Sequence, residues 1–306
     1  MRGFPQREAE LKRRLEAILD GHPSAERATL DPVSFPRRLL LDGAPRPEIE
    51  LVGLLAAMLA YGRLELFTRV TREILDRAGG KLLETALGKR RFRGSWPGYR
   101  LSTGSDIARL VRAGARVIAD RGGLWESFRR GWKDTRSLKD GLIALQRDIL
   151  AAAEADGPEP VSRGLAHLLP DPARGGAVKR WLMFARWMIR PDDGVDLGLW
   201  PDVSPATLLM PLDRHISRIA RHLGFTRRST DDWKTTLEIT EALRRLCPDD
   251  PVKYDFALCH LGIAGLCTHG NDPDVCAACG LRGLCSAPQK GAGPPSRARR
   301  RPGTSS

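Results

Sequence analysis

The stretch that decides the fold runs from residue 175 to residue 285 and contains three informative strings. Residues 175–190 read GGAVKRWLMFARWMIR, residues 210–218 read MPLDRHISR, and residues 267–285 read CTHGNDPDVCAACGLRGLC. The first string predicts a glycine-containing hairpin that leads into a helix beginning near Val178. The second predicts the start of another helix, and the third carries four cysteines in the pattern C-x8-C-x2-C-x5-C. We therefore expect a lysine, an aspartate and a cysteine loop, in that order, to carry the chemistry.

The rest of the chain predicts an all-α scaffold around this stretch. Apolar residues recur at helical spacing in many segments, and no alternating strand pattern of convincing length is present. A break at residues 157–160 suggests two lobes, an N-terminal helical part (1–160) and a hairpin and catalytic part (161–266). A cluster loop (267–285) and a disordered basic tail (286–306) follow. Residues 29–47 are rich in proline and are expected to be irregular. Helices are predicted over residues 9–19, 48–59, 64–78, 105–119, 123–131, 138–155, 161–169, 212–223, 229–246 and 251–266.

The charge balance points to a polyanionic partner. Fifty Lys and Arg against 37 Asp and Glu give a net charge of +13, and five of the basic residues lie in the tail after Cys285. Nucleic acid is the first expectation, although solubility or a bias toward arginine codons would give the same excess. The N-terminus lacks the apolar stretch of a signal peptide, and no apolar run is long enough to span a bilayer. We therefore expect a cytosolic, nucleoid-associated monomer with no membrane partner.

The cysteines favour a metal site. In the cytosol thiols stay reduced, so clustered cysteines indicate metal or redox chemistry more often than disulfides. Cys267, Cys276, Cys279 and Cys285 fit one tetrahedral metal or one iron–sulfur cluster, and their spacing does not choose between zinc and iron–sulfur. His260 and His269 are alternative ligands. The remaining two cysteines, Cys247 and Cys259, are expected to be buried core thiols.

Several residues before the cysteine loop have the character of DNA contacts. Tyr61 and Arg63 flank Gly62 at a helix–helix corner, where they could act as a wedge and a phosphate contact or form an ordinary capped corner. Residues 90–99 mix arginines with Phe92, Trp96 and Tyr99, which suits either nucleic-acid stacking or a loop that packs its aromatics inward. A glycine-containing hairpin that leads into a helix N-terminus points backbone N–H groups outward, where they can bind a phosphate. The candidate hairpin contacts are Gly175, Gly176, Arg180 and Arg186.

These motifs resemble the helix-hairpin-helix DNA glycosylases (the HhH-GPD superfamily) typified by endonuclease III. The resemblance rests on the order of hairpin, lysine helix, aspartate helix and four-cysteine motif. The string Leu212-Asp213-Arg214-His215-Ile216-Ser217-Arg218 is similar to that family's catalytic-aspartate string. Three features depart from it: the first cysteine gap has eight residues instead of six, only Gly175-Gly176 remains of the hairpin pattern, and the interval from Lys179 to Asp213 is long. That interval, and the strings around Lys179 and Asp213, are closer to the archaeal 8-oxoguanine glycosylases and to an uncharacterised bacterial branch of the superfamily.

The resemblance implies base-excision repair of double-stranded DNA carrying a damaged base or an abasic site. Asp213 would stabilise the oxocarbenium character of the sugar and would deprotonate the nucleophile. Lys179 would attack C1′ and form a Schiff base, which gives AP-lyase activity. We expect the helix dipole and Arg180 to lower the pKa of this lysine. A 4Fe–4S cluster on the four cysteines is implied, with zinc as the alternative.

Two other functions fit the same residues. The first is a non-catalytic binder of damaged or structured nucleic acid that keeps the glycosylase scaffold, with Asp213 as a plain helix cap and Lys179 as a phosphate contact. The second is a zinc-containing DNA-binding regulator. Which base is excised does not follow from the sequence, because the pocket is assembled only by folding.

Overall fold

The computed structural model describes residues 4–29, 31–263 and 265–287, and their regular structure is helical, which confirms the all-α prediction. This part of the chain contains no β-strand, and only isolated bridges such as Gly176 with Asp232 occur in it. None of its helices has the length and apolar character needed to cross a lipid bilayer. The tail predicted to be disordered lies outside the described residues from Pro288 onward.

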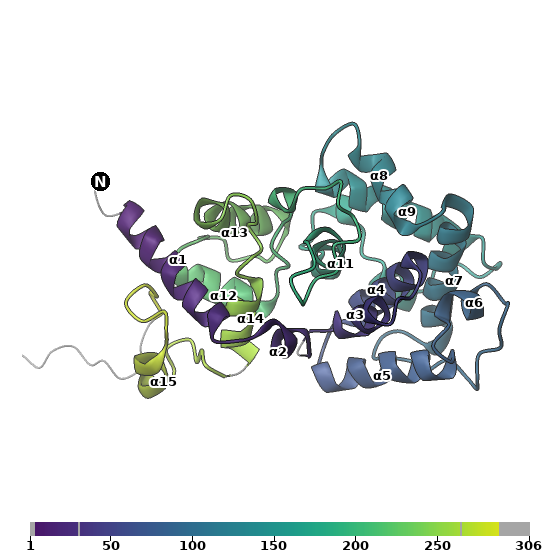
Figure 1. Ribbon diagram of the computed structural model, residues 1–306, viewed down its shortest axis with the longest axis horizontal. Coiled ribbons are helices and arrows are strands. Elements are labelled where there is room, and N and C mark those ends of the chain that lie inside the picture. Colours follow the sequence, from purple (N-terminus) through teal and green to yellow (C-terminus); the bar gives the residue numbers. More distant parts are fainter. Residues whose placement is uncertain (1–3, 30, 264, 288–306) are drawn as a thin grey trace, which may run out of the picture.

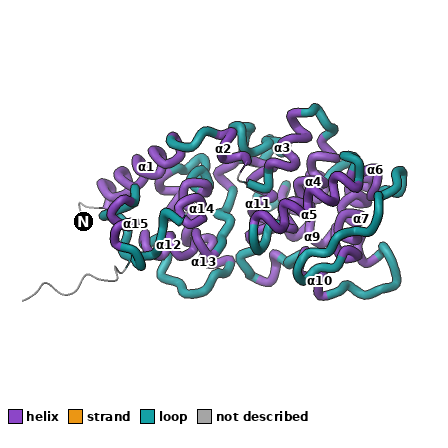
Figure 2. Tube along the Cα trace, turned by 90° about the horizontal axis from the view of Figure 1, so that it is seen from below, coloured by secondary structure: helices purple, strands orange, loops and turns teal. Residues whose placement is uncertain are grey.

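The helices gather into two groups at opposite ends of the long axis (Figure 1). The view from below separates the same two groups, with α11 (Lys179–Ile189) between them (Figure 2). One group contains α1 (Phe4–Asp20), α12 (Arg214–Leu223), α13 (Trp233–Leu246), α14 (Asp255–Ile263) and α15 (Pro273–Ala278). The other contains α3 (Ser34–Leu41), α4 (Arg46–Leu59), α5 (Leu64–Arg77), α6 (Leu82–Ala86), α7 (Gly104–Arg121), α8 (Leu124–Trp132), α9 (Leu138–Glu154) and α10 (Arg163–Leu168), with the short α2 (Ser24–Thr29) leading into it.

Helix α4 is the centre of the larger group because its sequence is apolar around almost its whole circumference. Every residue from Glu48 to Leu59 is buried. Two glycines let neighbouring helices approach closely. A Cβ on Gly53 would lie 2.8 Å from the end of the Met188 side chain of α11, and a Cβ on Gly114 of α7 would lie 2.9 Å from Leu51. The packing of α11 on α4 therefore fixes the position of the helix that carries Lys179.

Side-chain caps set most of the helix starts near the candidate site. Asp213 caps α12, and Asp232, whose side chain accepts from Thr235 N, caps α13. The predicted helix start at residue 229 was early, because Ser229 and Thr230 lie in a bend and α13 begins at Trp233 with Asp232 as its cap. The prediction of an irregular segment over residues 29–47 was also wrong in part. Helix α3 forms there with Pro36 inside its first turn, where the missing N–H of proline costs no helical hydrogen bond.

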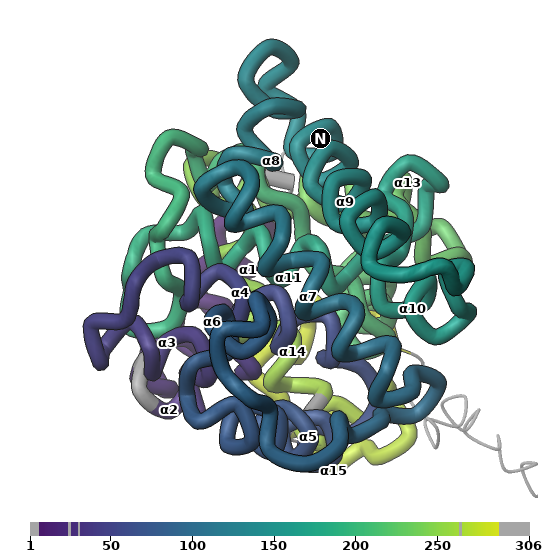
Figure 3. The backbone as a smooth tube through the Cα atoms, turned by 90° about the vertical axis from the view of Figure 1, so that its right-hand side faces the viewer, coloured from purple at the N-terminus to yellow at the C-terminus, as the bar shows by residue number. Residues whose placement is uncertain are grey.

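The first helix packs with the last ones, which the division at residue 160 did not anticipate. Helix α1 contacts α13 and α14. Arg7 donates to the carbonyl oxygens of Leu223 and Leu284 at 2.9 Å each, and Arg14 donates to those of Gly280 and Arg282. The lobe that carries the cysteine loop is therefore built from both ends of the sequence. Figure 3 shows α15 at the same lower side of the molecule as α5, opposite α8.

Candidate functional site

Lys179 and Asp213 meet where α11 and α12 begin. Lys179 is the first residue of α11, and its Nζ lies 3.2 Å from Oδ2 of Asp213. The other carboxylate oxygen, Oδ1, accepts from the backbone N–H groups of His215 and Ile216 at 2.9 Å each. One oxygen therefore caps α12 while the second is free to pair with the lysine. The side chains remain 34% and 16% exposed, so solvent or a ligand reaches the pair.

The backbone before Lys179 is strained. Val178 has φ 39° and ψ 40°, the left-handed region that a β-branched residue rarely adopts. Gly175, with φ 79°, takes the same region without penalty. Two contacts hold the segment: Trp181 Nε1 donates to Pro170 O at 2.8 Å, and Trp233 N donates to Gly175 O at 2.9 Å. The hairpin thus delivers Lys179 in a fixed orientation at a cost of about 1–3 kcal/mol at Val178.

Cys259 of α14 is the third member of this group. Its Sγ lies 3.9 Å from Oδ2 of Asp213, and burial raises the pKa of the thiol, with the nearby Asp213 and Asp255 carboxylates raising it further. The thiol therefore stays protonated and points its weak donor at the carboxylate. Helix α14 comes this close because Gly262 has no side chain. A Cβ there would lie 2.5 Å from Cβ of His215.

Lys179 is a charged ammonium in this arrangement. Burial lowers the pKa of Lys179, but the Asp213 carboxylate more than offsets that effect, and the pKa is raised above its ordinary value. The expectation that the helix dipole and Arg180 lower this pKa was wrong, because the paired carboxylate is the nearest charge. A neutral amine therefore requires proton transfer to Asp213, across the 3.2 Å that separates the two groups.

Arg180 is engaged inside the protein. Its guanidinium lies 5.1 Å from the centre of the Tyr61 ring and donates to the carbonyl oxygens of Met58, at 2.7 Å, and His167. Burial lowers the pKa of Arg180 to about 10. Its role is to join α4, α10 and α11. The expectation that Arg180 contacts DNA therefore gains no support from its donors, which are already paired with backbone oxygens.

Arg186 is the centre of a buried ion-pair cluster and is not a surface residue. Its side chain is 7% exposed and pairs with Asp31 at 2.7 Å, Asp196 at 3.1 Å and Asp255. Burial raises the pKa of Asp255 to about 6, with Arg186 lowering it and Asp31 raising it. The expectation that Arg186 binds DNA was wrong, because a guanidinium that faces three carboxylates in the core cannot reach a phosphate.

Of the two wedge candidates, Arg63 is the more accessible. Its side chain is 77% exposed and lies 3.8 Å from Glu65. The Tyr61 hydroxyl donates to Tyr99 O at 3.0 Å, and its ring packs edge-on against His167. Tyr61 is therefore held in the corner. The hairpin glycines are open on one side, since a Cβ on Gly175 or Gly176 would meet no atom within 4 Å.

A family model spans the segment that carries this geometry. It matches residues 31–264, about three quarters of the chain, and its description is a protein of unknown function. The chain belongs to the DUF2400 family. No curated protein and no solved structure matches the sequence. The DUF2400 segment includes Lys179, Asp213 and Cys259 and ends before the cysteine loop, so the loop is an addition to the matched segment in this chain.

The cysteine loop packs beside the DUF2400 segment through the contact of His269 with His222 of α12. All four cysteines are free, and backbone N–H groups donate to two of them, from Leu281 to Cys279 Sγ and from Ala287 to Cys285 Sγ, at 3.5 Å each. Burial raises the pKa of Cys267, and the thiols of Cys279, Cys285 and Cys276 raise it further. Within the described ranges no group of three or more Cys, His, Asp or Glu is arranged to hold a metal ion. The metal or cluster on these four cysteines therefore stays a prediction, with the free thiols and the two N–H···S bonds as the observations that bear on it.

The loop contacts α12, the helix that Asp213 caps. The His222 and His269 rings lie 5.6 Å apart, and the carbonyl of His222 accepts from both N and Oγ of Ser286 at 2.8 Å. Burial lowers the pKa of His269 to about 4, and the nearby Arg218 contributes to the shift. His269 Nδ1 lies 3.5 Å from Cys267 Sγ. His269 thus connects the cysteine loop with the aspartate helix, whereas His260 stacks on Phe256 and lies against the His22 ring at a tilt.

Sequence reasoning missed the contribution of α14 to the site. Cys259 was expected to be only a core thiol, and Asp255 was not singled out. The two lie four residues apart, so they share one face of the helix. That spacing was a usable signal, but the partners on the other side, Asp213 and Arg186, come from distant segments.

Proposed function

We propose that this protein is a DNA glycosylase with AP-lyase chemistry that removes a damaged base from double-stranded DNA. The observation that carries the proposal is the Lys179–Asp213 pair at the meeting point of α11 and α12, at 3.2 Å. In this pair Lys179 is the nucleophile, and Asp213 is both the base that deprotonates it and the carboxylate that would lie next to the reacting carbon. The resemblance to the helix-hairpin-helix glycosylases supports the same roles.

The chemistry follows from the charges of the pair. Lys179 passes a proton to Asp213, and the neutral amine attacks C1′ of the extruded nucleotide. The C1′–Nζ bond forms as the N-glycosidic bond breaks, and the base leaves with that electron pair and takes up a proton. The departing base takes the proton that Asp213 accepted, and the regenerated carboxylate then stabilises positive charge on the sugar. The C1′–O4′ bond breaks next, O4′ takes up the second proton of the amine, and the resulting Schiff base permits elimination of the phosphate on the 3′ side.

Access to C1′ requires the nucleotide to leave the stack. Arg63, exposed at the corner that precedes α5, is the candidate for filling the gap. The backbone N–H groups of Gly176 and Lys179 donate no hydrogen bond within the described residues, so they are available to a phosphate at the start of α11. Partial exposure of the Lys179–Asp213 pair is consistent with a substrate that enters from this side.

A 4Fe–4S cluster on Cys267, Cys276, Cys279 and Cys285 is part of the proposal, with zinc as the alternative. The four free thiols and the two N–H···S bonds fit such a group. When bound, it would supply a crosslink within the loop and no step of the base-excision reaction. The loop residues themselves brace α12 through His269 and Ser286.

A second candidate function is non-catalytic binding of damaged or structured nucleic acid. The observation that favours it is the charged state of Lys179, because a stable ion pair also serves as a structural contact. A zinc-containing regulator would be distinguished by its metal content.

The decisive experiment is excision from a panel of lesion-bearing duplexes combined with borohydride trapping on abasic-site DNA. Wild type should release at least one base and form a covalent adduct, and Lys179→Ala should form none. Lys133→Ala, an exposed lysine at the end of α8, is the matched control and should trap as wild type does. If wild type releases no base and traps nothing, the glycosylase proposal fails and the binding function remains.

A further inference from the structure

The positive charge of the described chain is concentrated in one segment. Residues 63–100 contain ten basic and four acidic residues, an excess of six. Because the tail after Cys285 carries five of the total of thirteen, this segment holds six of the remaining eight. The segment comprises α5, α6 and the loop of residues 88–100. A surface of this kind attracts polyanions.

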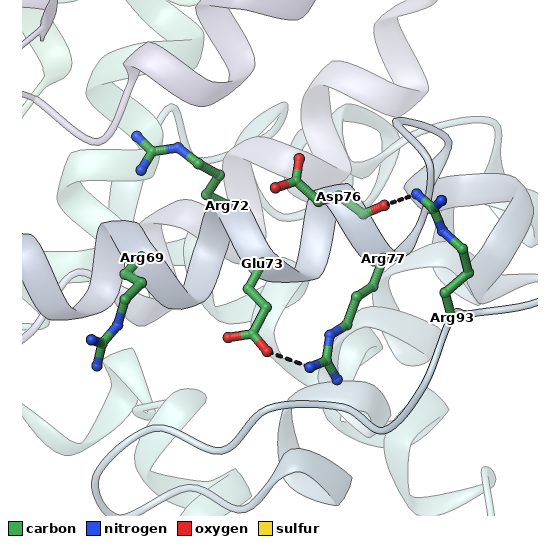
Figure 4. A pocket seen from close by; sticks show the side chains of 6 residues that line it. All are labelled: Arg69, Arg72, Glu73, Asp76, Arg77 and Arg93. Atoms are coloured by element: carbon green, nitrogen blue, oxygen red, sulfur yellow. Dashed lines mark hydrogen bonds and ion pairs between the residues drawn. The ribbon is translucent and has the colours of Figure 1, made fainter.

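Four arginines of this segment surround a hollow on α5. Arg69, Arg72 and Arg77 come from the helix, and Arg93 comes from the loop beside it (Figure 4). We call these four residues the α5 basic face. Two acids, Glu73 and Asp76, also line the hollow, and Glu73 pairs with Arg77 at 2.6 Å, so four positive charges face two negative ones. A net positive charge therefore remains.

Two arginines of the α5 basic face are available to a ligand. Arg69 and Arg72 are exposed and form no ion pair or side-chain hydrogen bond with the described residues. In Figure 4 the Arg72 side chain extends from one side of α5 and the Arg69 side chain from the other, so the two charges flank the helix. Arg69 and Arg77 are about 12 Å apart along the helix axis, a length that covers three to four phosphates of one duplex strand.

The neighbouring aromatic residues argue against a single-stranded ligand. Single strands are bound by exposed rings on which successive bases stack. Here Phe92 and Trp96 stack on each other, with ring centres 4.0 Å apart and planes 7° apart, and both pack against the core. Tyr99 is buried. The loop therefore offers charge without a free stacking platform, which is the character of a phosphate-binding surface.

The α5 basic face begins close to the candidate site. Helix α5 starts at Leu64, three residues after Tyr61. The Tyr61 ring contacts the guanidinium of Arg180, which follows Lys179 in α11. A duplex whose nucleotide reaches Lys179 would continue past the corner at Arg63. The six residues from Arg63 to Arg69 correspond to about 9 Å of helix.

We propose that the α5 basic face binds the sugar-phosphate backbone of duplex DNA on the flank of the nucleotide that enters the Lys179–Asp213 site. The position of the duplex relative to Lys179 rests on the proposed function. The contact between α5 and the phosphates does not require excision. The duplex would be held at two places, at the start of α11 and along α5.

The test compares two double variants that each remove two positive charges. The first is Arg69→Gln with Arg72→Gln. The matched control is Lys133→Gln with Arg147→Gln, exposed residues at α8 and α9 on the side of the molecule opposite α5 (Figure 1). Binding of full-length protein to an undamaged duplex and to a single strand of equal length is measured at several salt concentrations. Circular dichroism confirms that each variant is folded, since both exchanges replace one good helix former with another.

The α5 variant should bind the duplex more weakly, and the slope of log K against log salt should become less steep by about 2. The control should shift the slope by less than half as much. Equal effects of the two variants would overturn the proposal, and so would an equal loss of affinity for the single strand. If wild type excises a base but the α5 variant keeps the wild-type salt slope, the glycosylase proposal stands and the α5 contact is wrong. If the α5 variant has a less steep salt slope but wild type excises no base, the α5 contact stands and the glycosylase proposal is wrong.

Discussion

Nζ of Lys179 and Oδ2 of Asp213 lie 3.2 Å apart although 34 residues separate them in the chain. The contact exists because the strained turn at Val178 places the first residue of α11 beside Asp213, the residue that caps α12. Each partner is therefore held by backbone geometry and does not depend on the other for its position. This independence makes the two side chains separable by mutation.

Asp213→Asn should separate catalysis from stability. Asparagine caps a helix about as well as aspartate, so the free energy of unfolding should change by less than about 1 kcal/mol. Base release should fall by about 100-fold or more, because the amide neither accepts the lysine proton nor carries charge. Asp213→Ala should lose both activity and about 1 kcal/mol of stability. Urea unfolding and single-turnover excision check the pair, and unchanged turnover in Asp213→Asn would remove the residue from the mechanism.

Arg186→Met should be strongly destabilising. The substitution leaves Asp31, Asp196 and Asp255 without their shared cation in a buried site, at an expected cost of about 3–5 kcal/mol. Arg38→Met is the matched control, because Arg38 forms an exposed pair with Asp42 and should change stability by less than about 1 kcal/mol. The comparison is made by urea denaturation. A loss below about 1 kcal/mol in Arg186→Met would contradict the buried-cluster interpretation.

Asp255 should make stability depend on pH in the acidic range. Its pKa is about 6 in the folded protein against an ordinary value of 3.8, so the folded state binds the proton more tightly. Its contribution to stability should therefore fall as pH rises from 4 to 7, by up to about 3 kcal/mol. Asp255→Asn removes this dependence. The stability of wild type minus that of Asp255→Asn should be smaller at pH 8 than at pH 5, and the opposite order would refute the assignment.

The proposed metal site on the cysteine loop predicts that replacing one thiol reduces the metal content of the protein. Cys267→Ser should reduce bound iron and visible absorbance in anaerobically purified protein, and it should lower Tm because the loop braces α12. Cys247→Ser, at the end of α13, is the control and should keep its iron. Colourless protein with one zinc per chain would replace the cluster with the zinc alternative. Equal metal content in both variants would exclude these cysteines as ligands.

Hydrophobic periodicity predicted most of the scaffold, because each core helix carries its apolar spacing within its own segment of the sequence. The predicted bounds of α4, α5, α7, α8 and α9 lie within two residues of those in the structure. Helix α3 was missed because the prolines of residues 29–47 were interpreted as evidence of irregular structure. The cap of α13 was misplaced because Ser229, Thr230 and Asp232 are all good caps, and only the chain path selects Asp232.

The site was predictable only in part for a different reason. Lys179 and Asp213 lie in strings with a recognisable order, so both could be named from the sequence. The burial of Arg186 could not be predicted, because its three carboxylate partners come from residues 31, 196 and 255. The pKa of Lys179 was predicted in the wrong direction because a charge 34 residues away outweighs the neighbouring Arg180.

The same cluster constrains the order in which the protein matures on the ribosome. Asp31 is synthesised early, Arg186 much later and Asp255 last, and Cys259 follows on the same helix. Until that helix has left the exit tunnel, the cluster lacks Asp255 and the Lys179–Asp213 pair lacks the thiol beside it. Helix α1 also waits for α13 and α14 before it has a surface on which to pack. Completion of the group formed by Lys179, Asp213 and Cys259 is therefore a late event in biosynthesis.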